Sequence, residues 1–448
     1  MIRCLLFFFL VSSSIFLHAQ EKDTVPDIED VAQKFYSTYS IDDSDYQRVF
    51  FEKKSEGWFV VSKKIVNHSL EDDKRELYYS LREKDYKELD FRKEAKIISD
   101  LSEYLNSYEV QWFRLYPYYG YNGWYKDLIK KLEGERELSD NGLYLLARAY
   151  STFASSLLSD QFGFSIPEES FHPPLKANSL TKAQIEQYEQ VCKKAIDLYR
   201  QLKGRNSSFK TIVGNAEIKY ANEEVVRFHA LMTYATDYAK KISLPDRIYP
   251  DSIIQMAKFL MDACSKNAIF ISFGDNDFYP LLYLQQHDGY RKDLYVVNYS
   301  LLGLSPYINA YSRTLFDANR VVFYADTALY AGTNNDYVVL NESDTTYTME
   351  QLIDKMKKGP DDPPVELGGN SFSLKYEKGR IKDNTTVGSI AIVKVDGKYI
   401  VKNQWLLLDI INNLKGREID FPNELNDELK NLNYFLNWTG RVYRYKNF

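Results

Sequence analysis

The chain of 448 residues is poor in the residue types that build disulfide frameworks and many metal or catalytic sites, with 3 cysteines and 5 histidines. It also lacks the patterns GxGxxG, GxxxxGK[ST], HExxH, CxxC and GxSxG. Without them there is no motif for dinucleotide, P-loop, zinc-protease, dithiol or hydrolase chemistry. No nucleophile–base pair follows from the pattern either. The sequence therefore predicts no assembled catalytic site, and no cofactor.

Neither sign of charge dominates. There are 57 Lys and Arg residues against 63 Asp and Glu, giving a net charge of −6. The two signs are interspersed, which excludes the basic surface typical of proteins that bind nucleic acid or anionic membranes. Spanning a bilayer takes about 20 apolar residues, and no segment after the N-terminus is that apolar. We expect a mature chain without a transmembrane segment.

Residues 1–20 read as an export signal. Arg3 gives a positive start, residues 5–17 are mostly apolar, and a small residue, Ala19, ends a cleavage site. A membrane anchor is the alternative, but the apolar run is short for one and contains three serines. We expect an exported protein, periplasmic or at the cell surface. After cleavage Cys192 and Cys264 remain, and we expect two buried thiols rather than a disulfide.

Length and composition predict a folded protein with two or three units, since single domains usually hold roughly 100–200 residues. The hydrophobic share is 44%, and aromatic residues are abundant, with 37 Tyr, 26 Phe and 5 Trp. Residues 21–95 contain short β-like runs and predict a small β-containing unit. We expect a helical-hairpin domain at 96–265 and an α/β domain at 266–448.

The middle region has the helical period. In residues 185–203 the apolar side chains Ile185, Tyr188, Cys192, Ala195, Tyr199 and Leu202 recur at spacings of three and four. A similar stripe of Ile253, Met256, Ala257, Leu260 and Cys264 follows Pro250. Residues 225–242 predict one further long helix between them. Helices joined by short loops favour stacked antiparallel pairs, in a TPR-like arrangement.

From residue 266 onward the pattern changes to strand, helix and strand. Residues 268–273 and 294–299 are short apolar runs, as expected of strands buried on both faces of a parallel sheet. Residues 278–290 predict a short helix that ends at Gly289. Together they predict a parallel βαβ unit. Residues 320–325 and 389–395 are further candidate strands, and residues 402–414 predict a helix.

Three stretches of this region resemble a known family. The first comprises Gly274–Asp277, Tyr279-Pro280, Tyr283-Leu284-Gln285, Arg291 and Asn298. It is similar to a block in the soluble C-terminal part of large bacterial multi-spanning membrane proteins of unknown function, which are related to protein O-mannosyltransferases. Residues 405–421 and 433–445 resemble later blocks of that family, in the same order.

The resemblance covers about residues 250–448, and the membrane-embedded transferase part is absent from it. The sequence departs from the family pattern at Phe278, Leu414 and Glu418. The resemblance implies a Gram-negative envelope protein with this fold. It implies no activity.

The turn Gly274-Asp275-Asn276-Asp277 is the first candidate site. It follows a predicted strand, where open α/β sheets present ligand-binding loops. Asp275 and Asp277 are weak candidates to share a divalent cation, and the turn can equally bind sugar hydroxyls. The ligand-binding candidates are Asp275, Asn276, Asp277, Arg291 and Asn298. Alternatively, the turn only ends the strand and starts the helix. In that case we expect Gly274 to have a positive φ, Asp277 to be the N-cap of the helix, and Pro280 to lie in its first turn.

Residues 112–125 hold eight aromatic side chains in 14 positions and form the second candidate site. Flat rings can stack on sugars or receive an extended peptide. The surface candidates are Trp112, Tyr116, Tyr118, Tyr119, Tyr121, Trp124 and Tyr125. The alternative, which the pattern favours, is that these rings pack the entry to the first helical pair.

These observations favour an exported binding or scaffold protein of the cell envelope, with an envelope protein or a glycan as partner. The alternative is a metal- or sugar-dependent enzyme, or a glycosyltransferase accessory, centred on residues 275–277. The lack of assembled catalytic groups favours the binding protein.

Overall fold

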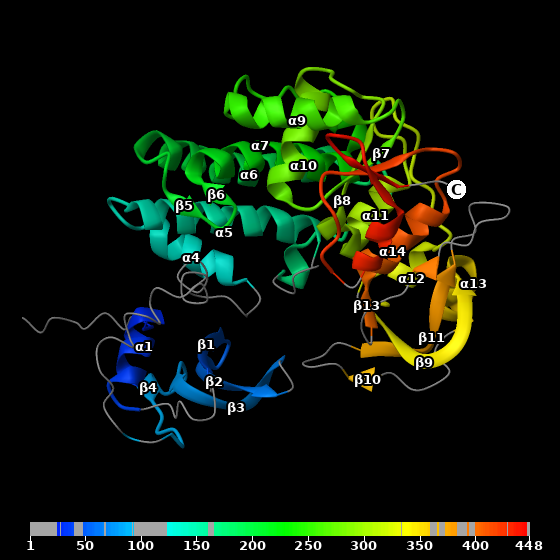
Figure 1. Ribbon diagram of the computed structural model, residues 1–448. Coiled ribbons are helices and arrows are strands. Elements are labelled where there is room, and N and C mark those ends of the chain that lie inside the picture. The colour runs from blue at the N-terminus through cyan, green and yellow to red at the C-terminus, as the bar shows by residue number, and fades with distance from the viewer. Residues whose placement is uncertain are drawn as a thin grey trace, which may run out of the picture. The chain divides into compact units, whose positions relative to one another are not determined.

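A computed structural model describes most of the chain after the predicted signal segment. The described residues are 25–26, 28–39, 48–66, 69–91, 93, 123–159, 165–332, 334–358, 365–366, 372–382, 392–393, 399–427 and 429–445. The chain divides into two compact units, Met1–Gly120 and Tyr121–Phe448 (Figure 1). The predicted export signal lies outside the described residues.

The first unit is a helix packed on a small antiparallel sheet. It comprises α1 (Ile28–Tyr36), β1 (Arg48–Lys54), β2 (Gly57–Val66), β3 (Ser69–Ser80) and β4 (Asp85–Tyr86), in the sheet order β1-β2-β3-β4. Aromatic side chains fill its core, among them Phe35, Phe51, Trp58 and Tyr78. The β1–β2 turn requires glycine, because Gly57 has φ 144° and a Cβ there would lie 1.9 Å from the Tyr79 carbonyl oxygen.

The second unit begins with long helices. They are α4 (Trp124–Glu133), α5 (Asp140–Leu158), α6 (Lys182–Arg205), α7 (Ala216–Tyr234), the short α8 (Thr236–Ala239) and α9 (Asp251–Ala263). The turn η2 (Pro167–Glu169) and the two-residue strands β5 (Lys210–Thr211) and β6 (Gly214–Asn215) lie in their connections. Helices α4 to α7 contact one another in sequence order. Whether they form a TPR-like repeat stays a prediction.

The predicted stripe of α6 is confirmed, since Tyr188, Cys192, Ala195, Tyr199 and Leu202 are all buried. The stripe predicted for α9 is wrong in part.

In α9, Met256 is 58% exposed, and the buried residues of the helix are Ala257 and Met261. The long helix predicted at 225–242 is also corrected. Helix α7 begins earlier, at Ala216, where the Asn215 side chain caps the Ile218 N–H, and it ends at Tyr234 before α8.

The predicted βαβ unit is confirmed. Strand β7 (Ile269–Ser272), helix α10 (Asp275–His287) and strand β8 (Tyr295–Asn298) form it, with β7 and β8 parallel and Ile269 paired with Tyr295. Every residue of both strands is buried, which explains their continuous apolar sequence. Gly289, at φ 66°, follows the end of α10, and the Tyr290 N–H bonds the Leu284 carbonyl.

Three later strands extend this sheet on the other side of β7. They are β14 (Ile419–Phe421), β15 (Leu436–Trp438) and β16 (Tyr443–Tyr445), and the sheet order is β15-β16-β14-β7-β8. Strand β14 is parallel to β7, while β16 is antiparallel to β14. The strand that follows β7 in the sequence, β8, lies on one side of β7, whereas the later strand β14 lies on the other side. The direction in which strands are added therefore reverses between β7 and β14. In open α/β sheets ligands bind outside the carboxyl ends of the strands at such a point.

A second sheet has the order β10-β11-β9-β13, with β12 beside β11. Its strands are β9 (Tyr337–Thr348), β10 (Val365–Glu366), β11 (Phe372–Lys382), β12 (Ile392–Val393) and β13 (Tyr399–Val401). The remaining helical elements are η3 (Tyr299–Gly303), α11 (Ser305–Tyr311), α12 (Thr327–Tyr330), α13 (Met349–Lys358), α14 (Lys402–Asn412) and η4 (Lys430–Phe435). The helix predicted at 402–414 is thus confirmed, whereas residues 320–325, predicted as a strand, form none.

Candidate functional site

The acidic turn lies where β7 ends and α10 begins. Gly274 is the N-cap residue, and its φ of −167° is extended backbone that any residue adopts, so the predicted positive φ is wrong. Its carbonyl accepts the N–H groups of Asp277 at 3.2 Å and Phe278 at 2.9 Å. The helix therefore starts two residues before the predicted N-cap, Asp277. Pro280 lies inside the helix rather than in its first turn.

The two carboxylates of the turn have different surroundings. Asp275 is half-buried and Asp277 is exposed. Desolvation raises the pKa of both, and Lys219 partly opposes this at Asp275. Among the described residues, no group of three or more His, Cys, Asp or Glu side chains is placed to hold a metal ion. A divalent cation at this turn stays a prediction for a solution experiment.

Asp275 faces a buried ionic cluster that joins three helices. On α7, Lys219 and Glu223 are 6% and 7% exposed, and their side chains form an ion pair at 2.5 Å. Ser151 of α5 donates a hydrogen bond to Glu223. Burial lowers the pKa of Lys219 and by itself would raise that of Glu223, but Lys219 and Ser151 outweigh burial and lower the Glu223 pKa. Lys219 thus balances a carboxylate on α7 and one on α10.

Asn276 has a structural role. Its amide nitrogen donates to the Val213 carbonyl at 2.7 Å, and its amide oxygen accepts from Asn222 at 2.9 Å. The buried Asn222 in turn accepts from the Tyr249 hydroxyl at 2.8 Å. This chain of bonds links the β5–β6 hairpin, α7 and α10. Both ends of the Asn276 amide make hydrogen bonds within the fold, and ligand binding by this residue stays a prediction.

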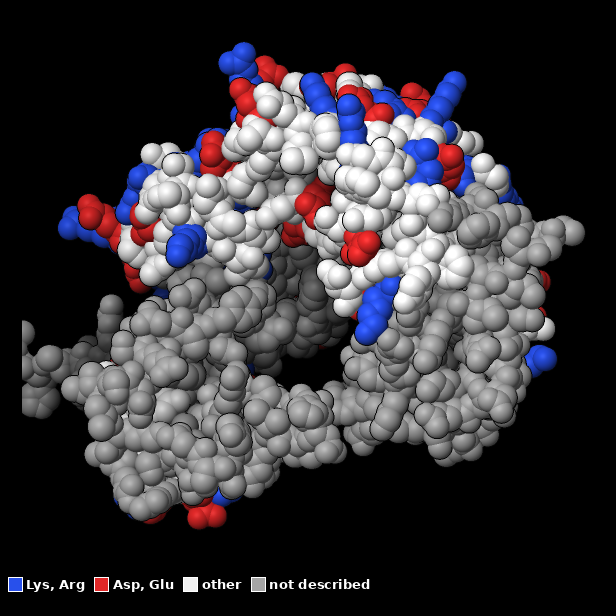
Figure 2. All heavy atoms as spheres, viewed as in Figure 1, with Lys and Arg blue, Asp and Glu red and all other residues white. Residues whose placement is uncertain are grey.

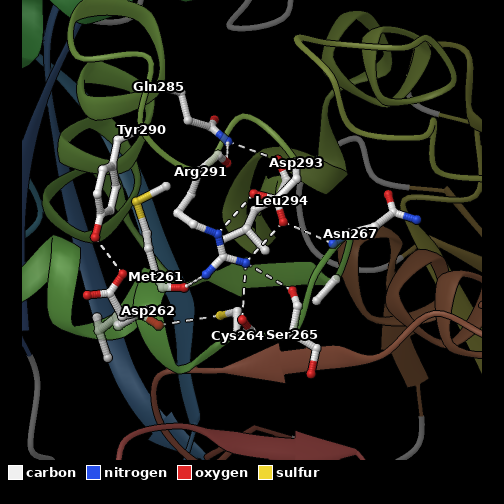
Figure 3. A network of polar contacts seen from close by, with 12 residues as sticks. Met261, Asp262, Cys264, Ser265, Asn267, Gln285, Tyr290, Arg291, Asp293 and Leu294 are labelled. Atoms are coloured by element: carbon white, nitrogen blue, oxygen red, sulfur yellow. Dashed lines mark hydrogen bonds and ion pairs between the residues drawn. The ribbon is translucent and has the colours of Figure 1, made fainter.

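Arg291 is also structural, as Figure 3 shows. Its guanidinium donates to the carbonyls of Met261, Cys264 and Ser265 at the C-terminal end of α9, and to both carboxylate oxygens of Asp293. A cation is favourable at this end of a helix, where carbonyls lack partners. Arg291 precedes β8, so it lies at the amino edge of the sheet, opposite the turn at residues 274–277. These bonds give Arg291 a structural role, and its prediction as a ligand-binding residue stays a prediction.

Asn298 ends β8 at the carboxyl edge of the sheet and is fully buried. Its amide oxygen accepts the Ser300 N–H at 3.0 Å, which caps η3. Its amide nitrogen has no hydrogen-bond partner among the described residues. Asn298 therefore shapes the turn after β8, and its burial keeps it from direct ligand contact.

The aromatic surface predicted at residues 112–125 lies mostly outside the described residues, including Trp112, Tyr116, Tyr118, Tyr119 and Tyr121. The two that are described are not surface residues. Trp124 is 0% exposed and Tyr125 is 1% exposed, at the start of α4. The Tyr125 ring stacks on Phe153 of α5 at 5.4 Å. For these two side chains the packing alternative is correct.

His229 is a packed core residue. It is 3% exposed, and its ring lies 4.8 Å from that of Tyr307 and 5.0 Å from that of Phe278. Burial lowers the pKa of His229 to about 3, so the ring is neutral at physiological pH. Cys192 and Cys264 are free and buried, as expected.

A crevice lies at the carboxyl edge of the sheet, where the strand order reverses. It has a volume of about 590 Å³. We call it the carboxyl-edge crevice. Phe273 follows β7, Tyr299 follows β8, residues 423–427 follow β14, and Tyr443 lies on β16. All three parallel strands therefore contribute to one site of the size that small ligands or single side chains occupy.

The wall formed by residues 423–427 is held in place by hydrogen bonds. The Asn433 side chain bonds both the N–H and the carbonyl of Leu425, at 2.9 and 2.8 Å. Asp427 accepts the Tyr299 hydroxyl and, at 2.8 Å, the Leu429 N–H. Glu424 is exposed, and we find no hydrogen bond or ion pair between it and another described residue. The crevice is thus built on fixed backbone, and within the described part of the chain the Glu424 carboxylate is unpaired.

One exposed aromatic side chain, that of Trp438, adjoins the crevice. Trp438 on β15 is 56% exposed, and its ring lies 4.9 Å from that of the crevice residue Tyr443. Tyr434 of η4 is 82% exposed. Trp438 and Tyr443 therefore present a pair of aromatic rings at the side of the crevice. Residues 423–427 carry no known motif, although an acidic and Asn-rich loop after a strand is a usable signal.

The structure also predicts one pH effect. His287, the last residue of α10, lies 2.6 Å from an Asp288 oxygen and 2.7 Å from an Asp246 oxygen. These bonds, to Asp288 first, raise the His287 pKa. The two bonds stabilise the fold fully at a pH below about 6.5, the ordinary pKa of histidine. This stabilisation is lost as the pH rises through the raised pKa of His287.

We expect His287→Gln to lower the free energy of unfolding at pH 6 by about 1 kcal/mol or less, because Asp246 is exposed and solvent screens the pair. The difference from wild type should shrink at pH 8.5. Urea unfolding of both proteins at the two pH values measures it. A difference that grew with pH would show that the protonated ring does not stabilise the fold.

Comparison with known proteins gives one match. Residues 253–446 match the family model TMEM260-associated domain 2, from the start of α9 through β16. TMEM260 is a membrane protein family, which agrees with the resemblance to a soluble region of larger membrane proteins. The relation to protein O-mannosyltransferases stays a prediction. No curated protein and no solved structure matches the chain. Within the described residues, no helix is both long and apolar enough to cross a membrane.

Proposed function

We propose that this chain is an exported envelope protein that binds a partner through the carboxyl-edge crevice and has no catalytic site of its own. The crevice carries the proposal. It lies at the strand-order reversal of the sheet, its acidic wall is fixed by the Asn433 and Asp427 hydrogen bonds, and the exposed Trp438 adjoins it. The export signal predicted at residues 1–20 supports the location.

The enzyme alternative has less support. Its centre was expected at residues 275–277. There the Asn276 side chain is hydrogen-bonded to Val213 and Asn222, and Asp275 faces Lys219. A rise in melting temperature with Mg²⁺, Ca²⁺ or Mn²⁺, abolished by Asp277→Asn, would favour the metal version of this alternative, since a ligand specific for the folded state must raise that temperature.

Affinity purification from the native envelope tests the binding role. We expect the wild-type chain to recover a stoichiometric partner, and Glu424→Lys to reduce its recovery at least about ten-fold by reversing the charge at the crevice. Glu137→Lys, at another exposed glutamate in the α4–α5 connection, is the matched control and should recover the partner like wild type. Equal recovery by all three proteins would place the binding surface elsewhere, and a lone monomer in every preparation would contradict the proposed function.

A further inference from the structure

The carboxyl-edge crevice has an excess of negative charge. Glu424 and Asp427 are among its lining residues, and the described residues that line it include no Lys, Arg or His. Asp427 accepts hydrogen bonds from the Tyr299 hydroxyl and from the Leu429 N–H, which hold its carboxyl group at the crevice. The described charges on the face in Figure 2 are of mixed sign, without a broad patch of either. The acidity of the crevice is therefore a local feature.

Basic residues near these strands have other partners. Arg444 on β16 bonds the fully buried Asp420 at 2.7 Å and pairs with Glu418 at 3.1 Å. The Arg441 guanidinium lies over the Phe259 ring, 4.6 Å from its centre. Neither side chain lines the crevice. Among the described residues that line the crevice no cation opposes its two carboxylates, so a cationic ligand group would be attracted there.

The rest of the lining also suits a cation. Phe273, Tyr299 and Tyr443 contribute aromatic rings, and Trp438 lies beside Tyr443. Aromatic faces attract ammonium and guanidinium groups, most strongly where water is partly excluded. The hydroxyl groups of a neutral saccharide can bond the carboxylates but leave their negative charge unopposed, and an anion would be repelled. An ammonium or guanidinium group satisfies the carboxylates and the rings together.

The neighbouring strand favours a peptide as the source of this cation. Strand β15 is an edge of the sheet, and its residues Asn437 and Trp438 are exposed. In an antiparallel pair, alternate residues direct their N–H and C=O groups away from the partner strand. An extended peptide can bind these groups by adding a strand. Trp438 pairs with the crevice residue Tyr443, so a peptide along β15 passes the crevice.

Building on the proposed function, we propose that the crevice receives a lysine or arginine side chain from an extended segment of the partner protein, which pairs with β15. The crevice gives the specificity for a cation, and the strand edge gives the specificity for a peptide.

Peptide libraries test this inference on the secreted chain, residues 21–448. The probe is a library of heptapeptides with Lys or Arg fixed at the centre, against matched libraries with norleucine or Nε-acetyllysine there. We expect capture of the Lys and Arg libraries to exceed that of the uncharged libraries at least about ten-fold, since the charged group supplies the contact. Glu424→Gln should reduce capture about three-fold or more, and Glu137→Gln should not.

Four other results of these binding experiments would contradict the inference or part of it. Equal capture of the Lys and norleucine libraries would overturn the inference. Tight binding of a neutral oligosaccharide at the crevice would overturn it while leaving the binding role of the crevice intact. Cadaverine that binds as tightly as the peptides would overturn the role of β15. If no library binds and the envelope partner is also insensitive to Glu424→Lys, both the inference and the proposed function fail.

Discussion

Replacing Lys219 by Met is expected to lower the free energy of unfolding by about 3–5 kcal/mol, since removing one member of a buried ion pair leaves an uncompensated charge. Glu223 is 7% exposed and keeps its carboxylate in the variant, and half-buried Asp275 loses the same cation. Urea denaturation of both proteins measures the difference.

The double variant Lys219→Met/Glu223→Gln is the control for this prediction. It removes both charges, so it should be more stable than Lys219→Met alone by at least about 1 kcal/mol. A single variant as stable as wild type would mean that Lys219 is solvated or unpaired in solution. The cluster would then not join α5, α7 and α10.

Replacing Arg291 by Met is expected to lower the free energy of unfolding by about 2–4 kcal/mol, because several charge-assisted hydrogen bonds are lost at once. The change leaves Asp293 without its guanidinium partner and the α9 carbonyls without a donor. Partner or peptide binding at the crevice should be unchanged once the protein is folded, because Arg291 lies at the opposite edge of the sheet.

Arg320→Met is the matched control, since Arg320 is exposed, and its effect should stay within about 0.5 kcal/mol. Thermal or urea unfolding separates the two variants. If Arg291→Met kept wild-type stability but lost ligand binding, the original prediction of a ligand-binding arginine would be correct and the structural assignment wrong.

The predictions that succeeded rested on local pattern. Strands β7 and β8 are short apolar runs because both faces are buried, and the burial of α6 follows its three-to-four spacing. The α9 stripe failed at Met256, because one apolar face does not say which part of it a neighbouring element covers. The structural role of Arg291 could not be predicted, because the carbonyls that it binds are 26–30 positions away in the sequence.

The crevice could not be predicted for a related reason. Phe273 and Asp427 are brought together only because β14 adds beside β7, and no local pattern in the sequence fixes that pairing. The acidic turn was noticed because its charges adjoin a strand. Its roles, facing Lys219 and bonding Asn222, depend on α7, which is distant in the sequence. Local patterns thus predicted the elements, and long-range packing decided the site.

The central claim is that the partner contacts the protein at the carboxyl-edge crevice. Site-specific photocrosslinking in the native envelope tests it most directly, with p-benzoylphenylalanine placed at Trp438 beside the crevice or at Tyr238 on α8. These side chains are 56% and 42% exposed, so both probes reach solvent. We predict one discrete crosslinked product from position 438 and none from position 238. A product from position 238 alone would contradict the account.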